Sequence, residues 1–454
     1  MLETHPLPAN PLRARRDEFD APDAPLQQGM PPPPERPQPS EPSPRSLRGL
    51  DWFIFFVADV QTGFGPFVSV FLTSQRWTQF DIGLVLSAAG FVSLLGQMPG
   101  GALVDAAKSE RLVAGIAIVV ICLSALMFAA MPIFPMVLSA AVLHSLASCV
   151  LGPAMAAISL GLVGHAGIGR RLGRNARFAS IGNGLAAAVM GACGYLLSAR
   201  AVFFVTVLLL GPALLALRSI SAREIDPERA HGAPPRRRPP DNPAAVAEQD
   251  SKRPRARAGD LMHNRPLLIF AGCLLLFHLA NASMLPLMGS VLTMRSSQWA
   301  TLLIAACIVV PQLMVAVASP WVGNRAQLWG RRPLLLIGFA ALPIRGILFA
   351  FVTNPTVLVL VQMLDGVTAA VLGVLVPLVV ADLTRGTGRF NLGQGILGTA
   401  IGIGASISAT IAGYMSDRLG SASAFAGLAA IACVGFAVLW FMMPETRPAE
   451  EAVG

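Results

Sequence analysis

The chain has 454 residues, of which 54% are hydrophobic and 13% are charged, and its formal net charge is +9. Soluble domains carry about 25% charged residues, so this composition excludes an ordinary soluble domain and indicates an integral membrane protein. In such a protein a net positive charge reports on membrane topology, and a nucleic-acid partner is not expected.

Residues 1–49 form a proline-rich segment without an apolar run long enough for a signal peptide or a membrane span. We expect this segment to be a disordered cytoplasmic tail, because few of its side chains can be buried. Its Pro-x-x-Pro spacings could bind an aromatic groove of a partner, but a solvated spacer is the favoured interpretation.

Twelve apolar segments follow the tail, each close to the length of about 20 residues that a helix needs to cross a bilayer. They are predicted near residues 50–72, 82–104, 111–131, 134–163, 176–198, 201–217, 266–288, 299–322, 333–352, 356–381, 391–415 and 423–443. The sequence therefore predicts an all-α integral membrane protein with twelve transmembrane helices.

The second six segments repeat features of the first six about 220 residues later. Asp59 in the first segment has its counterpart in Asn281 of the seventh, and His144 in the fourth has its counterpart in Asp365 of the tenth. Polar residues are costly in a bilayer, so their recurrence at matched depth indicates duplication and a shared central site. We therefore predict two pseudo-symmetric six-helix halves.

The repeat and the charges together divide the chain into functional parts. The halves are predicted at 50–217 and 265–446, joined by a basic cytoplasmic linker at 218–264 and followed by a short cytoplasmic tail at 447–454. The linker is expected to lie on anionic lipid headgroups.

Basic residues are distributed unevenly between the two sides of the predicted membrane. With the N-terminus inside, eleven lie in or beside the inner loops and four in the outer loops. The inner set is Lys108, Arg111, Arg170, Arg171, Arg174, Arg177, Arg325, Arg331, Arg332, Arg385 and Arg389, and the outer set is Arg76, Arg200, Arg295 and Arg418. This bias predicts cytoplasmic termini and insertion in the inner (cytoplasmic) membrane.

Neither a metal site nor a cofactor is indicated by the pattern of residues. The six cysteines lie singly within predicted spans, without the spacing of metal ligands. The glycines around 393–404 lack the lysine of a nucleotide-binding loop. We therefore expect neither ATP-driven transport nor enzymatic activity.

Three local motifs and the twelve-helix pattern resemble the major facilitator superfamily over about 50–446. The loop after the second span reads Gly101-Ala-Leu-Val-Asp105-Ala-Ala-Lys108-Ser-Glu-Arg111, similar to that superfamily's Gly-x-Leu-Ala-Asp-Arg-x-Gly-Arg-Lys signature. The loop after the eighth span, Gly323-Asn324-Arg325 and then Gly330-Arg331-Arg332, looks like a diverged copy in which an amide replaces the acid. Pro444-Glu445-Thr446 is similar to a tripeptide at the same place in sugar-transporting members.

The resemblance implies a cytoplasmic gate that clamps the two halves together in the outward-facing state. Asp105 would lie near Asn391, where the eleventh helix begins and a helix N-terminus favours an anion. The gate residues are predicted to be Asp105, Lys108, Arg111, Asn324, Arg331 and Arg332. The alternative is that Asp105 belongs to a solvated turn.

Small residues at steps of three and four follow the second, fifth and eleventh helices. The sets include Gly90 and Gly101, Gly184, and Gly398 and Gly402. Such stripes let helix backbones approach closely, so we expect these three helices at the interface between the halves.

Asp59 in the first span is the predicted proton-coupling residue. It shares a helix face with Pro66, which weakens the helix locally and frees backbone carbonyls. An acid in a low-dielectric cavity can take up and release a proton as water access alternates. The alternative is a structural acid that stays protonated or hydrogen-bonded.

Other buried polar residues are predicted to line the substrate cavity. His278 and Asn281 are expected to face Asp59 across it, and the fourth and tenth helices line the cavity in this superfamily. The set is Gln61, His144, Asn183, His278, Asn281, Asp365 and Gln394. The alternative for each is a hydrogen bond between helices without a role in substrate binding.

Arg345 in the ninth span is predicted to form a structural ion pair with Asp365, because the two lie at similar depth in antiparallel neighbours. The resemblance places the ninth helix at the periphery, away from substrate. The alternative is that Arg345 attracts an anionic substrate.

The resulting functional prediction is an alternating-access secondary transporter, monomeric, in the lipid bilayer. Its partners are protons and a small-molecule substrate, and the apolar spans favour efflux of an amphipathic metabolite or drug. The fifth helix lacks the Gly-Pro-x-x-Gly-Gly pattern of antiporters, so an uptake symporter for a small organic solute is the alternative. A membrane receptor or assembly factor that kept the fold without transport is the alternative from another class.

Overall fold

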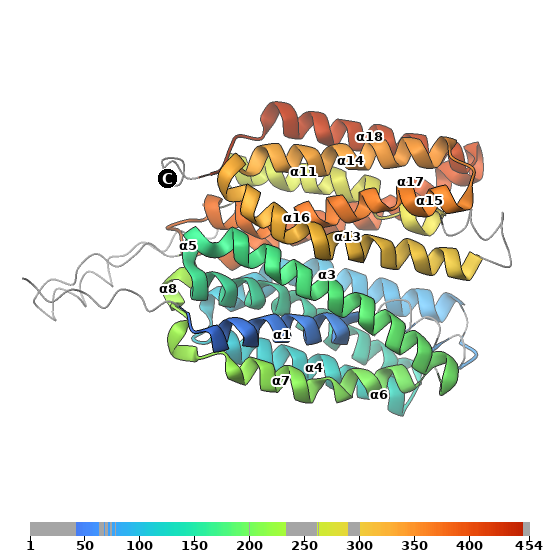
Figure 1. Cartoon of the computed structure of the whole chain (residues 1–454). Coiled ribbons are helices and arrows are strands. Elements are labelled where there is room, and N and C mark those ends of the chain that lie inside the picture. The colour runs from blue at the N-terminus through green and yellow to red at the C-terminus, as the bar shows by residue number, and fades with distance from the viewer. Residues whose placement is uncertain are drawn as a thin grey trace, which may run out of the picture. The chain divides into compact units, whose positions relative to one another are not determined.

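The computed structural model describes residues 42–62, 68, 71–72, 75–77, 79–198, 200–232, 261, 263–288 and 300–447. Within these ranges the chain is built from helices (Figure 1). They are α1 (Pro44–Thr62), α3 (Gln79–Ala106), α4 (Glu110–Ala130), α5 (Phe134–Leu196), α6 (Ala201–Leu208), α7 (Leu210–Ser219), the 3₁₀ helix η2 (Ala222–Glu224), α8 (Pro227–Ala230), α11 (Arg265–Asn281), α13 (Ala300–Trp329), α14 (Arg331–Phe351), α15 (Pro355–Val361), α16 (Met363–Leu383), α17 (Phe390–Leu419) and α18 (Ser421–Met442).

The predicted all-α membrane class is confirmed. Ten helical stretches in the described residues are long and apolar enough to cross a bilayer. One of them, within α5, covers two predicted spans, whereas α6 with α7, and α15 with α16, each cover one. The first predicted span, 50–72, continues past the end of α1 into residues outside the described ranges.

Two boundaries differ from the sequence prediction. The first helix begins at Pro44 rather than near residue 50, and Ser46 and Leu50 are buried. α5 continues through the loop predicted between the fourth and fifth spans, with a break at Gly164, where φ is +65°. Glycine adopts this left-handed backbone without a steric penalty, so the chain can turn there. The tails at 1–41 and 448–454 lie outside the described residues.

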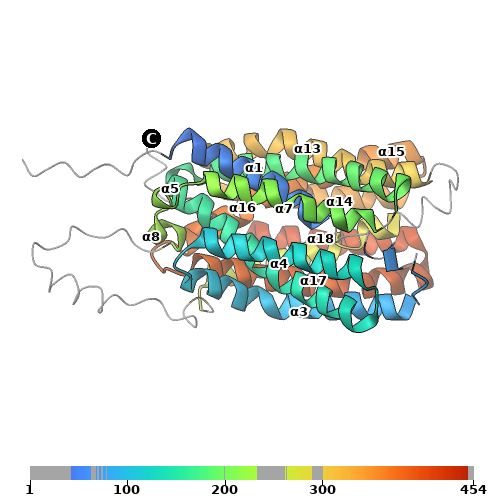
Figure 2. The same ribbon diagram turned by 90° about the horizontal axis from the view of Figure 1, so that it is seen from below.

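The two halves pack as separate groups of helices. Figure 1 shows α1 to α7 (blue to green) on one side and α11 to α18 (yellow to red) on the other, and in Figures 1 and 2 α1, α5 and α7 lie side by side. The second half has its own apolar core, which includes Phe270, Phe277 and Phe339. Leu50, Phe53 and Ile118 belong to the core of the first half.

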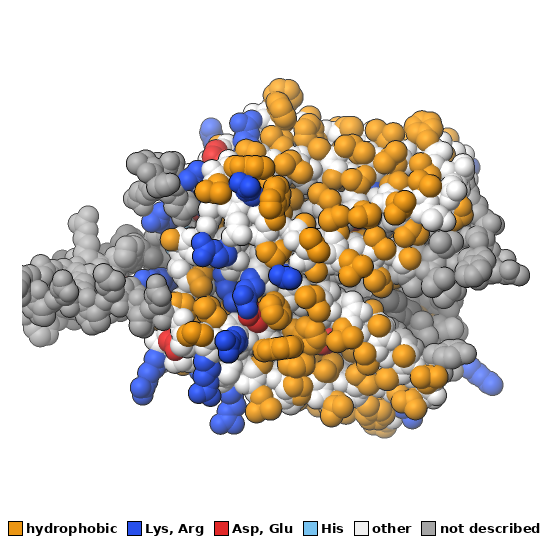
Figure 3. Space-filling view, in the orientation of Figure 1, with side chains coloured by type: hydrophobic (Ala, Val, Ile, Leu, Met, Phe, Trp, Pro, Cys, Tyr) orange, Lys and Arg blue, Asp and Glu red, His pale blue; other side chains and the backbone are white. Residues whose placement is uncertain are grey.

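Charged side chains gather at one end of the helices. Figure 3 shows lysines and arginines concentrated at the end where α8 lies, and hydrophobic side chains over much of the remaining face. We call this the basic end; α3 finishes and α4, α14 and α17 begin there. An apolar surface with basic residues gathered at one end is the pattern expected of a protein in a bilayer.

The halves approach each other most closely near the basic end. A Cβ at Gly101 of α3 would clash with the Asn391 carbonyl of α17, and one at Gly169 of α5 would lie 2.9 Å from the Gly323 carbonyl oxygen of α13. The predicted interface is confirmed for the second, fifth and eleventh helices, and α13, the eighth, joins them. Further along the stripes, a Cβ at Gly90 or Gly184 would meet no described atom within 4 Å.

The beginning of the predicted linker is not a free connection but packs on the basic end. Asp226 donates its amide to the Gly161 carbonyl (3.2 Å), which holds α8 on the first half. The Gly232 carbonyl accepts from the Gly386 amide (2.7 Å) of the second half. His231 lies 3.1 Å from Glu110, which opens α4. Residues 220–232 therefore form a strap that contacts both halves; residues 233–260 lie outside the described ranges.

Candidate functional site

A central cavity of about 550 Å³ lies between the halves. Residues of α1, α3 and α5 line it on one side, and residues of α13, α16 and α17 on the other. Five of the lining side chains are amides, namely Gln97, Asn175, Asn183, Gln312 and Gln394. An amide both donates and accepts hydrogen bonds, so the cavity offers polar contacts from both halves.

The rest of the cavity wall is apolar or small. It includes Ile54, Met155, Val315 and Ile401 beside Gly152. None of the described residues that line it is charged or aromatic. The cavity therefore suits a neutral part of a solute that has both apolar surface and hydrogen-bonding groups.

Two of the predicted cavity residues line this space, and five do not. Asn183 and Gln394 are in the wall. Those outside it are Gln61, His144, His278, Asn281 and Asp365. The prediction was wrong for these five because the repeat gives depth along a helix but not the direction in which each side chain points.

The predicted residues that lie outside the cavity wall have other surroundings. His144 Nε2 lies 3.4 Å from Ser148 Oγ one turn along α5, and the His278 ring packs edge-on against Phe277. Gln61 is half-buried in the last turn of α1. Gln97, Asn175 and Gln312 also line the cavity but were not predicted; the available signal was that each is an amide within an apolar helix.

The repeat suggested that Asp59 faces Asn281 across the central cavity, but it does not. Its side chain borders a separate apolar pocket of about 190 Å³, formed by α1, α5, α6 and the residue before α7 and lined by Phe55 and Met190. Asp59 is only 4% exposed, and its Oδ1 atom has no hydrogen-bond partner among the described residues. Gly182 explains the close packing here, because a Cβ at that position would lie 3.3 Å from Asp59 Oδ1.

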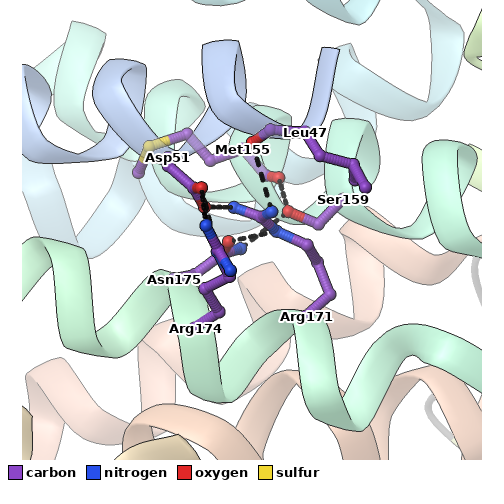
Figure 4. Close-up of polar contacts among 7 residues, drawn as sticks. All are labelled: Leu47, Asp51, Met155, Ser159, Arg171, Arg174 and Asn175. Carbon is purple, nitrogen blue, oxygen red and sulfur yellow. Dashed lines mark hydrogen bonds and ion pairs between the residues drawn. The ribbon is translucent and has the colours of Figure 1, made fainter. Parts of the chain in front are cut away.

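A buried ion network joins α1 to α5 at the basic end (Figure 4). Asp51 accepts from Arg171 (2.6 Å) and from Arg174 (2.6 Å). Arg171 also donates to Asn175 Oδ1 (2.7 Å), and Asn175 donates to Ser159 (2.8 Å). Because Asn175 lines the central cavity, the network fixes one of the cavity amides from behind.

A second buried ion pair holds the basic end of the other half. Arg331 Nε lies 2.9 Å from Asp382 of α16, and both side chains are almost fully buried. Glu445 accepts from the amides of Arg331 (2.8 Å) and Arg332 (3.0 Å), so it caps α14. The Pro444-Glu445-Thr446 motif thus has a structural function here.

The predicted gate residues divide into three groups. Asp105 accepts from the Asn391 amide (3.1 Å), the Asn391 side chain (2.8 Å) and the Leu392 amide (2.8 Å), which ties the halves together at the start of α17. Lys108 and Asn324 are exposed.

The remaining gate residues do not link the halves. Arg331 donates to Asp382 and Arg332 to the Trp440 carbonyl, both of which belong to the second half. Arg111 borders a groove between α4 and α7. The gate assignment therefore needs correction for these three arginines, because each basic side chain is turned toward a partner or groove of its own half.

Arg345 and Asp365 lie in contact, in the arrangement that the sequence suggested. One guanidinium nitrogen of Arg345 donates to Asp365 and another to Asn281. Arg345 is 2% exposed, and its guanidinium lies over the Phe349 ring (5.9 Å to the centroid). None of these residues lines the central cavity, so the geometry supports a structural pair over a substrate site.

Similarity to known proteins is extensive. The sequence profile of the Major Facilitator Superfamily matches residues 51–315 and 273–454. An uncharacterized MFS-type transporter of Mycobacterium tuberculosis is 39% identical over 403 residues, covering 88% of this chain and 93% of that protein. The class B tetracycline resistance protein of Escherichia coli is 32% identical over 135 residues, which is 30% of this chain and 33% of that protein.

Solved structures share the fold at low sequence identity. The human organic anion transporter MFSD10 has a TM-score of 0.62 and 15% identity, with 88% of this chain and 100% of that chain covered. The proton:xylose symporter XylE has a TM-score of 0.64 and 15% identity, with 89% and 96% covered.

Proposed function

The chain belongs to the major facilitator superfamily, and on that premise we propose that it is an alternating-access transporter that exports an amphipathic metabolite or drug in exchange for protons. The observation that carries the proposal is the central cavity between the halves, with amides from both sides and apolar walls. A solute bound there would contact both halves, so its binding can be coupled to their relative movement.

The lining of the cavity narrows the class of solute. A charged centre would have no counter-ion among the described lining residues, and a sugar ring would have no aromatic face on which to stack. Apolar walls beside five amides match a molecule with an apolar body and several hydrogen-bonding groups. Tertiary packing gathers these five amides at one place from four helices, α3, α5, α13 and α17.

The direction of transport is the less constrained part of the proposal. Export is supported by the partial relative whose name ties it to tetracycline resistance. Uptake of a small organic solute is the second candidate, and the same amide cluster favours it because amides also bind hydroxyl-rich solutes.

The packing at the basic end supports an outward-facing state with a closed cytoplasmic gate. Asp105 binds the first turn of α17, and the glycines of α3, α5 and α13 close the same end. For the cavity to open toward the cytoplasm, the contacts of Asp105 and of the strap to the second half would have to break. This assignment requires the basic end to be cytoplasmic, as the charge bias suggests.

Membrane orientation can be tested by labelling single cysteines in intact cells. In a Cys433→Ser background, Lys108→Cys at the basic end is expected to resist a membrane-impermeant maleimide, whereas Arg200→Cys at the opposite end is expected to react. Both positions are exposed, so a difference in labelling reports which side of the membrane each position faces. If only Lys108→Cys were labelled, the basic end would face the outside of the cell, and the proposed orientation would be wrong.

Asp59 is the proposed proton site. Asp59 is buried, and its Oδ1 atom has no hydrogen-bond partner among the described residues. A buried carboxylate without a partner is costly, so this burial favours the protonated carboxyl group, and Asp59 is suited to take up a proton. Asp51 and Asp382, by contrast, are held by arginines. Asp59 would act through the packing of α1 on α5, because it does not touch the cavity.

The cavity can be tested by filling it without disturbing helix packing. A Cβ at Gly152, which lines the cavity, would meet no atom within 4 Å. Gly152→Leu is expected to lower transport at least about fivefold, because extra methylenes in a fitted site cost about 1–3 kcal/mol. Gly272→Leu is the matched control, since Gly272 is equally open but lies outside the cavity wall.

The measurement is metabolite profiling inside and outside cells of an efflux-deficient host that expresses each variant. The solute should accumulate outside cells with the wild type and Gly272→Leu, and inside cells with Gly152→Leu. The opposite distribution would establish uptake. Identical profiles with and without the protein would favour a non-transporting receptor or assembly factor.

A further inference from the structure

A second large groove lies on the outer surface of the first half, apart from the central cavity. It has a volume of about 550 Å³ and runs between α4 and α7. Its lining includes Ser109, Arg111 and Arg218 at the basic end, followed by apolar residues along both helices. Since α4 and α7 belong to predicted spans, the groove faces the bilayer at the depth where apolar chains meet headgroups.

The polar end of the groove is positively charged and unpaired. No ion pair found among the described residues includes Arg111 or Arg218. The Nε atom of Arg111 is buried and has no hydrogen-bond partner among them. Glu110, the nearest acid in the sequence, is buried and lies against His231 instead. The first turn of α4 adds the positive end of its helix dipole. An anion is therefore the complementary ligand for this end.

The remaining part of the groove is suited to an acyl chain. Leu112 and Ile116 of α4 are 63% and 56% exposed, and Leu214 and Leu217 form the facing wall. Gly115 has no side chain to fill the space between the two walls, and this keeps the groove deep. A Cβ at this position would lie only 3.3 Å from Leu217 Cδ2. From Arg111 to Val120 the helix rises about 13 Å, at about 1.5 Å per residue, which accommodates most of a lipid tail.

We propose that the groove between α4 and α7 binds an anionic phospholipid, with its phosphate at Arg111 and Arg218 and one acyl chain along the apolar track. A free phosphate would leave the apolar track without a partner. A lipid satisfies both ends at once, and the leaflet at the basic end supplies it.

Native mass spectrometry of the purified full-length protein, titrated with phosphatidylglycerol or phosphatidylethanolamine, tests the proposal. Phosphatidylglycerol is expected to bind more tightly. Arg111→Gln combined with Arg218→Gln should weaken that binding about 25-fold, at about fivefold for each arginine near an anionic headgroup. Arg170→Gln with Arg177→Gln removes the same charge from exposed positions outside the groove and should leave binding within about twofold.

A second variant and a competitor distinguish the acyl track and the source of the phosphate. Gly115→Leu keeps both arginines, fills the track and should also weaken phosphatidylglycerol binding, while inorganic phosphate in excess should not displace the lipid. Equal weakening by the two double variants would overturn the proposal in favour of diffuse charge attraction. Full displacement by inorganic phosphate, or wild-type affinity in Arg111→Gln/Arg218→Gln, would overturn it as well.

Discussion

Asp59→Asn is expected to abolish accumulation of solute against a gradient while leaving exchange of solute across the membrane intact. The amide keeps the size and hydrogen-bonding capacity of the carboxyl group but cannot titrate. One charge moved across 100 mV is worth about 2.3 kcal/mol, so losing it removes a driving force of about 50-fold in concentration. The assay is pH-driven uptake or release by proteoliposomes, with solute exchange at equal pH measured in parallel.

The control for this experiment is Asp417→Asn, which removes an exposed acid near the end of α17. It should leave both coupled transport and exchange unchanged. If Asp59→Asn kept full pH-driven transport with normal proton movement, Asp59 would not be the proton site. His144, His278 or Asp365 would then have to serve, although each lies outside the cavity wall.

Arg345→Ala is expected to destabilise the protein severely, because it removes the positive charge that pairs with Asp365 and the donor that Arg345 supplies to the Asn281 oxygen. Breaking a buried ion pair by removing one partner costs about 3–5 kcal/mol. The side chain of Asp365 is 27% exposed, so the lower part of that range is expected. Thermal unfolding of the detergent-purified protein, followed by tryptophan fluorescence, measures the change.

Combining Arg345→Ala with Asp365→Asn should recover much of the lost stability, because the unpaired charge is then gone. Arg177→Ala, at an exposed arginine, is the control and should change stability by no more than about 0.5 kcal/mol. Strict additivity of the two single changes would argue against coupling between Arg345 and Asp365. An effect on solute affinity at unchanged stability would instead favour the anionic-substrate alternative.

Features that depend on local composition could be predicted from the sequence. The helices at 110–130 and 421–442 lie within a few residues of their predicted bounds, because apolar length and charged ends are visible residue by residue. The small-residue stripes of α3 and α17 likewise indicated their close approach. The Asp105 motif led directly to the contact with Asn391.

The boundaries that sequence missed depend on contacts made at a distance. Pro44 to Leu50 look like the end of a proline-rich tail, yet Ser43 is held by Glu224 (2.9 Å) from the strap and α1 begins there. The strap itself has too few apolar residues to be recognised as an element. Its order comes from hydrogen bonds to Gly161 and Gly386.

The sequence by itself determined the membrane class, the two halves and the depth of each polar residue, because apolar length and the repeat are properties of the chain alone. Only the tertiary structure decided which way those residues point. Asp59 turns into a pocket beside Gly182, whereas Gln97, Gln312 and Gln394 converge on the cavity from three helices. The rotation of a helix about its axis is set by packing against its neighbours. A helix that is apolar on all sides has no polar face in its sequence from which this rotation could be predicted.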